Sequence, residues 1–424
     1  MTSKLALLGG APVVTECAPS WPVSGELEVA WMEAVVRSGQ WSWLGPHERA
    51  FCSEFASFLG CKHVLLLANG TVTLQCSLQA VGVKPGDEVI VPALTWVATL
   101  QAVLDVGANA VVVDIDPETY CLDVKAAEKA ITLKTKAIIP VHLYGCMCDM
   151  DGVLSLAKKY SLKVVEDVAH QHGSRWRNFG AGAIGDAGSF SFQQSKVLTC
   201  GEGGAISCHD EQVFETAFCL KHVGWKPDLA TPGNRYGHNY RMTEMQAVLL
   251  RGGLRRLPEH LRIREENAFR LAEGMKKLAG PVRAARRDPR VTRQSYYALT
   301  LHYDEKKASG LPRSQYLTAL AAEGCPLGTP YLPVYRHPLL NLYDATSPVP
   351  YREEIQDYRS LRLPVTENVV EKEGAILMHP HLLGSEKYIQ QLLQAMAKVN
   401  DNLKAVKNFF AREGGSVKKG IKEE

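Results

Sequence analysis

Short, unbroken apolar runs alternate with amphipathic stretches between about residue 60 and residue 210. Unbroken Val, Ile and Leu runs separated by helical patterns are typical of strands that helices cover on both faces. The pattern therefore predicts an α/β fold with a largely parallel sheet. The expected strands are 63–68, 88–91, 110–114, 137–142, 163–166, 188–192 and 204–207, and the expected helices include 71–81 and 96–106.

The pattern changes in the second half of the chain. Residues 244–275 predict a helix, interrupted near Pro258, that links two domains. A strand over 294–302 and helical periodicity over 386–410 then indicate a smaller α+β unit. A chain of 424 residues is also long for a single core. We expect a large domain over residues 1–260, which includes the N-terminal segment, and a smaller one over 261–424.

Composition indicates an ordinary soluble protein. Apolar residues make up 46% of the chain and charged residues 22%, and the net charge of +3 gives no strong field for nucleic acid or membrane. No apolar stretch reaches the ~18 residues of a membrane span. Eleven scattered cysteines fit free thiols in a reducing cytoplasm better than a disulfide framework. Cys146 and Cys148 are too close for a zinc knuckle, so we expect no metal.

Lys196 is the most informative residue, because it lies between a strand that ends in serines and a Gly-Glu-Gly-Gly turn. A lysine in an apolar strand-end pocket can lose its proton and attack an aldehyde. Asp167 follows the strand 163–166 and could keep a pyridine nitrogen protonated, whereas Glu166 must face the other side of the strand. Each residue alone is commonly a surface lysine or a helix cap. Together they predict a pyridoxal phosphate (PLP) enzyme.

Other candidate residues also follow predicted strands, where ligands of such sheets bind. Gly70 and Thr71 open a helix and could bind a phosphate with its amide groups, although an Asn-capped helix start is the commoner meaning. Ser191 could add a hydroxyl to that phosphate or simply end its strand. Trp96 could stack on a pyridine ring or pack ordinarily, and His170 could bind the ring's 3′-oxygen or a backbone group.

The ordered motifs around these residues resemble the DegT–StrS family of PLP-dependent sugar and cyclitol aminotransferases, which have the aspartate aminotransferase fold (fold type I). The resemblance covers roughly residues 20 to 400. It is carried by Asn-Gly-Thr-Val-Thr-Leu (69–74), Asp-Glu-Val-Ile-Val-Pro-Ala-Leu-Thr-Trp-Val-Ala-Thr (87–99), Ala-Ile-Ile-Pro-Val-His-Leu-Tyr-Gly (137–145), Val-Glu-Asp-Val-Ala-His (165–170), Ser-Phe-Gln-Gln-Ser-Lys-Val-Leu-Thr-Cys-Gly-Glu-Gly-Gly (191–204) and Gly-His-Asn-Tyr-Arg-Met (237–242).

The resemblance implies a role for each candidate. Lys196 would form the Schiff base with PLP and then move the substrate proton, and Asp167 would contact the pyridinium nitrogen. The resemblance also implies that Asn239 reaches the phosphate of the neighbouring protomer's cofactor, and hence a homodimer with shared active sites. The remaining implied cofactor contacts are His170 near O3′, Trp96 on the ring, and Gly70, Thr71 and Ser191 at the phosphate.

Finer likeness indicates a subgroup. Segments 291–297, 330–339 and 378–383 resemble glutamine-dependent scyllo-inosose aminotransferases, and the segment that ends at Lys196 is also close to 3-amino-5-hydroxybenzoate synthases. Both resemblances imply a free carbocyclic ketone in place of a nucleotide sugar. Val168, Ser195 and the segment 224–235 depart from the sequence pattern of these subgroups, so the resemblance does not identify the acceptor substrate.

The leading hypothesis is transfer of an amino group from L-glutamine or L-glutamate to a polyhydroxylated cyclic ketone. Scyllo-inosose and 2-deoxy-scyllo-inosose, from aminocyclitol antibiotic-type biosynthesis, are the example acceptors. The alternatives are an aromatising amination to an aminobenzoate, a nucleotide-keto-sugar aminotransferase, and a PLP-binding regulator without catalysis, which the intact Lys196 and Asp167 disfavour. The candidate residues for the substrate hydroxyls are Arg241, Tyr331, Tyr335 and His379.

Overall fold

A seven-stranded sheet forms the centre of the larger part of the molecule in a computed structural model, which describes residues 4–340, 342–343, 346 and 356–412. In space the strands follow the order β1-β9-β8-β5-β4-β2-β3. Only β9 runs antiparallel to its neighbours, so the expected, largely parallel sheet is confirmed. The strands are β1 (His63–Leu67), β2 (Glu88–Pro92), β3 (Asn109–Val113), β4 (Thr135–Ile138), β5 (Lys163–Asp167), β8 (Ala187–Ser191) and β9 (Gly204–Cys208).

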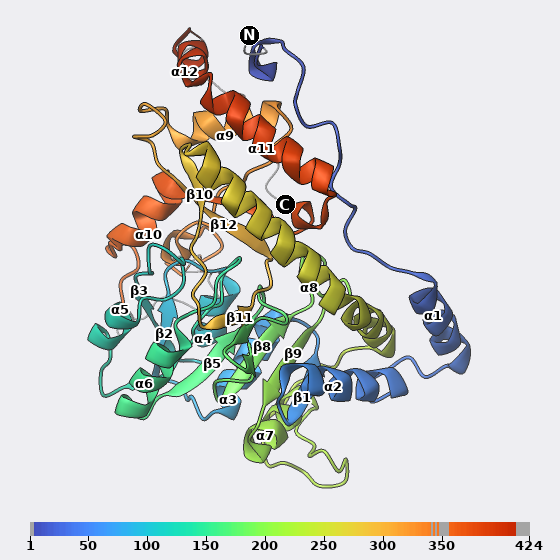
Figure 1. Ribbon diagram of the computed structural model, residues 1–424. Helices are drawn as coiled ribbons and strands as arrows, with labels where there is room; N and C mark the ends of the chain where they lie inside the picture. The colour runs from blue at the N-terminus through green and yellow to red at the C-terminus, as the bar shows by residue number, and fades with distance from the viewer. Residues whose placement is uncertain (1–3, 341, 344–345, 347–355, 413–424) are drawn as a thin grey trace.

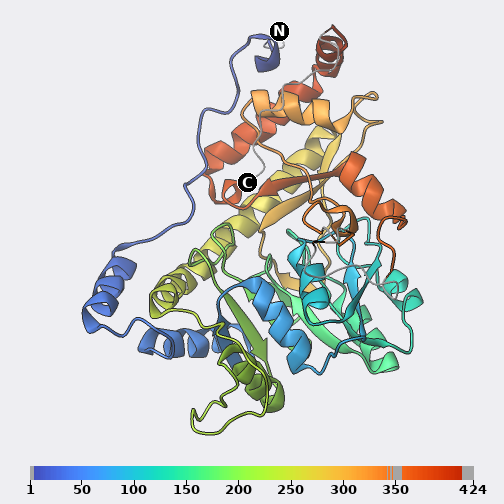
Figure 2. The same cartoon turned by 180° about the vertical axis from the view of Figure 1, so that it is seen from behind.

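Helices cover both faces of this sheet, as the two opposite views show (Figure 1, Figure 2). The central strands are therefore closed to solvent, and Val89, Ile90 and Val91 of β2 have no exposed surface. Burial on both faces explains why these strands are apolar throughout. The helices of this part are α1 (Glu26–Ser38), α2 (Pro46–Leu59), α3 (Gly70–Ala80), α4 (Ala98–Asp105), α5 (Val124–Lys129), α6 (Met150–Tyr160) and α7 (Glu211–Lys221).

A second, antiparallel sheet of order β10-β12-β13 forms the smaller part and has its own hydrophobic cluster. It comprises β10 (Val282–Ala284), β12 (Ala298–Tyr303) and β13 (Gly374–Met378). A third sheet combines β11 (Val291–Arg293) with β6 (Arg175–Trp176) and β7 (Phe179–Gly180). The helices here are α9 (Arg313–Ala322), α10 (Pro364–Asn368), α11 (Glu386–Asn400) and α12 (Leu403–Arg412).

The long helix α8 (Glu244–Leu278) runs from the larger part to the smaller one (Figure 1). The sequence prediction of an interruption near Pro258 was wrong, because the helix continues through the proline. Proline removes one backbone hydrogen bond. Leu254, Leu257 and Leu261 are buried on both sides of it, and their packing holds the two halves in one helix. The predicted domain limit at residue 260 falls inside α8, and the division into two domains stays a prediction.

The N-terminal segment lies beside α11, far from the strands that follow it in sequence (Figure 1, Figure 2). Leu5 is buried in the hydrophobic cluster of the smaller part. The buried carboxylate of Glu323 accepts hydrogen bonds from the backbone N–H of Ala6 at 2.7 Å and of Val13 at 3.2 Å. The first residues of the chain therefore complete the smaller part.

Candidate active site

Two adjacent carboxylates at the end of β5 face opposite sides of the sheet. Glu166 accepts hydrogen bonds from the backbone N–H of Ile184 and Gly185, both at 2.8 Å, and its other oxygen lies 3.0 Å from His142 Nε2. Asp167 lies on the other face, where Thr99 Oγ1 donates to its Oδ2 at 2.9 Å. Burial raises the pKa of Asp167. The hydrogen bonds of Glu166 thus hold neighbouring parts of the fold together, whereas Asp167 faces the candidate site.

Lys196 follows β8 across a short turn, and its amine lies within the electrostatic reach of Asp167. Its Nζ lies 4.5 Å from the centroid of the Tyr297 ring. Burial lowers the pKa of the lysine ammonium, while Tyr297 and Asp167 act in the opposite direction. The fold therefore holds a lysine whose neutral, nucleophilic form is more accessible than that of an exposed lysine.

The start of α3 and the end of β8 meet beside this pair. A Cβ on Gly70 would lie 2.7 Å from the Cβ of Ser191, so only glycine permits this approach. The side chain of Asn69 caps α3 and accepts from the N–H of Thr71 at 3.1 Å and of Val72 at 3.0 Å. The ordinary capping function is therefore present. Gly70, Thr71 and Ser191 nevertheless lie together, as a phosphate site requires.

His170 lies in a stack of aromatic rings. Its ring centroid lies 3.9 Å from that of Tyr297, at 17°, and 5.7 Å from that of Tyr144. The backbone N–H of Tyr144 donates to His170 Nδ1 at 3.2 Å, so a neutral His170 carries its proton on Nε2. Burial, and then the charge of Lys196, holds the pKa of His170 well below its usual range. Nε2 is a donor that an oxygen of a bound ring can use, and it lies 3.4 Å from Tyr331 Oη.

Trp96 and Tyr331 form the more open side of the site. The Trp96 side chain is 46% exposed, and its ring lies 5.5 Å from that of Tyr331. The Tyr331 backbone N–H donates to the Tyr144 hydroxyl oxygen at 2.7 Å, which fixes this segment beside His170. This exposed indole beside the Tyr331 ring provides a flat surface on which an aromatic ring can stack.

The other predicted site residues lie elsewhere or have protein partners. The Tyr335 hydroxyl donates to Glu367 at 2.8 Å, and His379 is buried between Arg264 and the backbone of Ser195. These contacts do not support substrate binding by Tyr335 or His379. Asn239 and Arg241 of the Gly-His-Asn-Tyr-Arg-Met motif lie on the segment after α7: Arg241 Nη1 contacts His222 Nδ1 at 2.9 Å, and Asn239 is exposed.

Three side chains of the site were not found by sequence reasoning. Tyr297 faces the Lys196 amine, Tyr144 stacks on His170, and Thr99 binds Asp167. Thr99 and Tyr144 stand inside motifs that follow strands, which was a usable signal. Tyr297 precedes β12 of the smaller sheet, and nothing local in the sequence relates it to Lys196.

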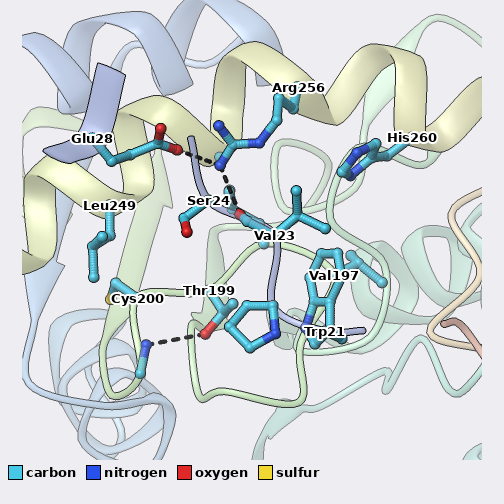
Figure 3. A pocket seen from close by; sticks show the side chains of 14 residues that line it. Trp21, Val23, Ser24, Glu28, Val197, Thr199, Cys200, Leu249, Arg256 and His260 are labelled. Atoms are coloured by element: carbon cyan, nitrogen blue, oxygen red, sulfur yellow. Dashed lines mark hydrogen bonds and ion pairs between the residues drawn. The ribbon is translucent and has the colours of Figure 1, made fainter. Parts of the chain in front are cut away.

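The loop after Lys196 also lines a surface hollow of about 520 Å³ (Figure 3). Trp21 and Val23 of the N-terminal segment, Val197 and Thr199 of the loop, and His260 of α8 surround it. Three parts of the chain that are far apart in sequence therefore meet beside the loop that carries Lys196, residues 192–203, which we call the lysine loop.

A half-buried lysine and a buried carboxylate at the strand ends of this fold define an α/β transferase of the aspartate aminotransferase-like class. The chain belongs to the DegT/DnrJ/EryC1/StrS aminotransferase family, which it matches over residues 22–394. It is therefore an aminotransferase, and its cofactor is pyridoxal phosphate.

Relatives agree with this assignment over nearly the whole chain. A Streptoalloteichus tenebrarius protein, provisionally named an L-glutamine:3-amino-2,3-dideoxy-scyllo-inosose aminotransferase, is 38% identical over 96% of this chain and 100% of its own length. An L-glutamine:2-deoxy-scyllo-inosose aminotransferase of Streptomyces lividus is 36% identical, covering 94% and 98%. The crystal structure of 3-amino-5-hydroxybenzoic acid synthase is similar with a TM-score of 0.81 and 31% identity, over 92% of this chain and 99% of that one.

The residues present fit the cofactor. The Gly70–Ser191 approach leaves space at a helix start for a phosphate, the buried Asp167 suits a pyridinium nitrogen, and the proton on His170 Nε2 suits a phenolic oxygen. No helix in the described part of the chain is long and apolar enough to cross a membrane.

Proposed function

We propose that this aminotransferase moves the amino group of L-glutamine to the ring ketone of a cyclic polyol of the 2-deoxy-scyllo-inosose type. The names of the relatives with 34–39% identity over nearly the full length support the donor and the acceptor class. One structural observation carries the chemistry: the Lys196 amine, with its lowered pKa, faces Tyr297 and lies within the electrostatic reach of the buried Asp167.

Lys196 has two tasks in this proposal. Its amine tethers the cofactor between turnovers, and once the substrate amine has displaced it, the free amine carries a proton to and from the substrate. Bound pyridoxal phosphate carries the amino group from donor to acceptor and withdraws electrons from the carbon that loses its proton. Asp167 keeps the pyridine nitrogen protonated, which strengthens that withdrawal.

The other residues hold the cofactor in place. Gly70, Thr71 and Ser191 would bind the phosphate, Trp96 would stack on the ring, and His170 would donate from Nε2 to the ring oxygen. All five follow or end the strands β2, β5 and β8 or open α3, which supports this proposal. Among the candidates for the substrate hydroxyls, Tyr331 is the one that borders both Trp96 and His170.

Asn239 serves a second protomer in this proposal, and Arg241 stays a candidate for the substrate hydroxyls. Both lie on the segment after α7, which projects at the lower edge of Figure 1, and Asn239 is exposed. A homodimer would bring Asn239 to the phosphate of the partner's cofactor. We also propose a cytoplasmic location, which the eleven free cysteines favour.

The deciding experiment offers the purified protein L-glutamine with 2-deoxy-scyllo-inosose, and follows the amino product by mass spectrometry. Formation of the aminocyclitol supports the proposal. The second candidate is an aminating and aromatising activity, which the likeness to 3-amino-5-hydroxybenzoic acid synthase favours. It predicts a product with near-ultraviolet absorbance. Turnover of nucleotide keto-sugars alone would contradict both.

A further inference from the structure

The buried side chain of His379 joins α8 to the lysine loop. Arg264 Nη2 lies 3.1 Å from His379 Nδ1, and His379 Nε2 lies 2.8 Å from the backbone carbonyl of Ser195, the residue before Lys196. Arg264 and His379 are almost completely buried, at 0% and 1% exposure. The contact therefore reaches the loop from inside the protein.

The chemistry of the three groups fixes the direction of both hydrogen bonds. A guanidinium group only donates and a carbonyl only accepts, so Nδ1 of His379 must accept and Nε2 must carry the proton. An imidazolium would turn the Nδ1 proton toward the guanidinium. Burial, and then the charge of Arg264, holds the pKa of His379 well below its usual range. Arg264 and the Ser195 carbonyl thus select the same neutral tautomer of His379, in which Nε2 donates to Ser195.

Arg264 has a second route to the same loop. Its guanidinium carbon lies 5.2 Å from the centroid of the Trp21 ring, and Trp21 Nε1 donates to the carbonyl of Gln194 at 3.0 Å. Trp21 and His379 themselves meet edge to face at 4.7 Å. Figure 3 shows Trp21 beside Val197, the residue after the lysine. The two neighbours of Arg264 therefore bind two consecutive carbonyls ahead of Lys196.

Arg264 is an unusual structural residue, because it is a buried cation without a carboxylate partner among the described residues. Its Nε and Nη1 atoms have no hydrogen-bond partner within that part of the chain. Burying an uncompensated charge is unfavourable. Stability alone gives no reason for a guanidinium here, since an apolar side chain would fill the space at lower cost.

We propose that Arg264 is a positioning residue that, through His379 and Trp21, fixes the peptide carbonyls of Gln194 and Ser195 and thereby aims the Lys196 amine. This inference rests on the proposed function of Lys196 as the cofactor-bearing lysine. The third anchor is Tyr297, whose hydroxyl lies 3.1 Å from Ser195 Oγ. With the loop held by these contacts, Nζ lies over the Tyr297 ring and within the electrostatic reach of Asp167.

The first test reads the tautomer directly in the holoenzyme and in the cofactor-free protein, by nitrogen NMR of histidine-labelled protein, with His379→Gln used for assignment. We expect a neutral imidazole with the proton on Nε2. In Arg264→Met the Ser195 carbonyl still requires the proton on Nε2, so we expect the same tautomer but a shifted Nδ1 resonance, because Nδ1 loses its hydrogen-bond donor. A proton on Nδ1, an imidazolium at neutral pH, or an unchanged Nδ1 resonance in Arg264→Met would overturn the proposal.

The second test separates positioning from folding. His379→Gln keeps an N–H donor for Ser195 and should keep most of the turnover, whereas His379→Leu should lower kcat by about 10- to 100-fold with unchanged KM, as expected for a displaced reacting group. His379→Leu should also shift the pH midpoint of the cofactor absorption band. The matched control is His381→Gln, which loses a contact to the Tyr388 hydroxyl (2.7 Å) away from the loop and should behave as the unaltered protein.

Equal kcat and equal band midpoints in His379→Leu and His381→Gln would also overturn the proposal. If His379→Leu does not fold, the tautomer measurement still decides. Borohydride reduction distinguishes failure of the proposed function from failure of the positioning proposal. Absence of a reduced pyridoxyl label on Lys196 refutes the proposed function. Presence of the label together with the wrong tautomer of His379 refutes only the positioning by Arg264.

Discussion

The two sides of Lys196 are built in different ways. On one side, Asp167 and Ser191 end two neighbouring strands of the large sheet and Gly70 opens α3, so this side offers a carboxylate, a hydroxyl and a helix start. On the other side, Tyr297 and His379 come from the segments around β12 and β13 and offer a flat ring and a fixed hydrogen bond. The side of Asp167 and Ser191, which we call the sheet side, supplies charge for the chemistry. The side of Tyr297 and His379, which we call the small-sheet side, sets the position of the amine. Substitutions on the two sides should therefore change activity and stability to different extents.

The largest effect is expected for Lys196→Ala, which removes the tether and the proton carrier together. Turnover should fall by about 10⁴-fold or more, and borohydride should attach no pyridoxyl group to the protein. Steady-state kinetics and peptide mass spectrometry check both results. Lys158→Ala, on the exposed face of α6, is the matched control and should be unaffected. Multiple turnovers by Lys196→Ala would remove the basis of the comparison.

The adjacent carboxylates of β5 give the next largest effect and the clearest contrast. Asp167→Asn should lower kcat by about 1000-fold, equivalent to about 4 kcal/mol of barrier, because the pyridine nitrogen loses its anionic partner. Its melting temperature should not fall, since burial already raises the pKa of Asp167 and a neutral amide fits the place.

Glu166→Gln should do the reverse. Both of its oxygens accept from backbone N–H groups, Oε1 from Ile184 and Gly185 and Oε2 from Gly182, and an amide NH₂ cannot replace either acceptor. The free energy of unfolding should drop by about 1–3 kcal/mol, measured in urea, while kcat of the folded protein stays unchanged. If Asp167→Asn and Glu166→Gln changed kcat and the free energy of unfolding in the same way, the assignment of the two carboxylates to opposite faces would be wrong.

Tyr297 tests the small-sheet side, with smaller effects. Tyr297→Leu removes the ring that stacks on His170 and faces the Lys196 amine, contacts worth about 0.5–2 kcal/mol, so kcat should fall by about 10-fold. Tyr297→Phe keeps the ring and loses only the hydroxyl contact to Ser195, and should fall less. Steady-state kinetics on both variants gives the order. A larger loss in Phe than in Leu would assign the main function to the hydroxyl.

The pH dependence of cofactor capture is the subtlest test. Only the neutral amine of Lys196 is nucleophilic, so capture of pyridoxal phosphate by the cofactor-free protein should speed up with rising pH and level off above the pKa of Lys196. Burial lowers that pKa, so the plateau should begin below the ordinary lysine value of about 10.4. Stopped-flow absorbance measures it. A plateau at or above that value would mean that the amine is not desolvated.

The sheet side of the site was predictable from the sequence, and the small-sheet side was not. Strand ends converge at one edge of a parallel sheet, so Asp167, Ser191 and Lys196 could be placed together from local patterns alone. The Ser195–Tyr297 contact spans 102 residues, and the Arg264–His379 contact spans 115. Side-chain packing between distant segments decides those pairs, and no periodicity encodes it. The same packing carries α8 through Pro258, where local chemistry predicted a break.

The hydrogen bond from Ala6 to Glu323 closes a loop of 317 residues. During synthesis, the first stretch of the polypeptide leaves the ribosome long before its docking surface exists, and it has to wait until α9 and α11 have formed. The strands from 63 to 208 can meanwhile assemble among themselves. A truncation that begins after Ala18 should therefore spare the early-formed sheet and weaken the last part of the polypeptide to be made.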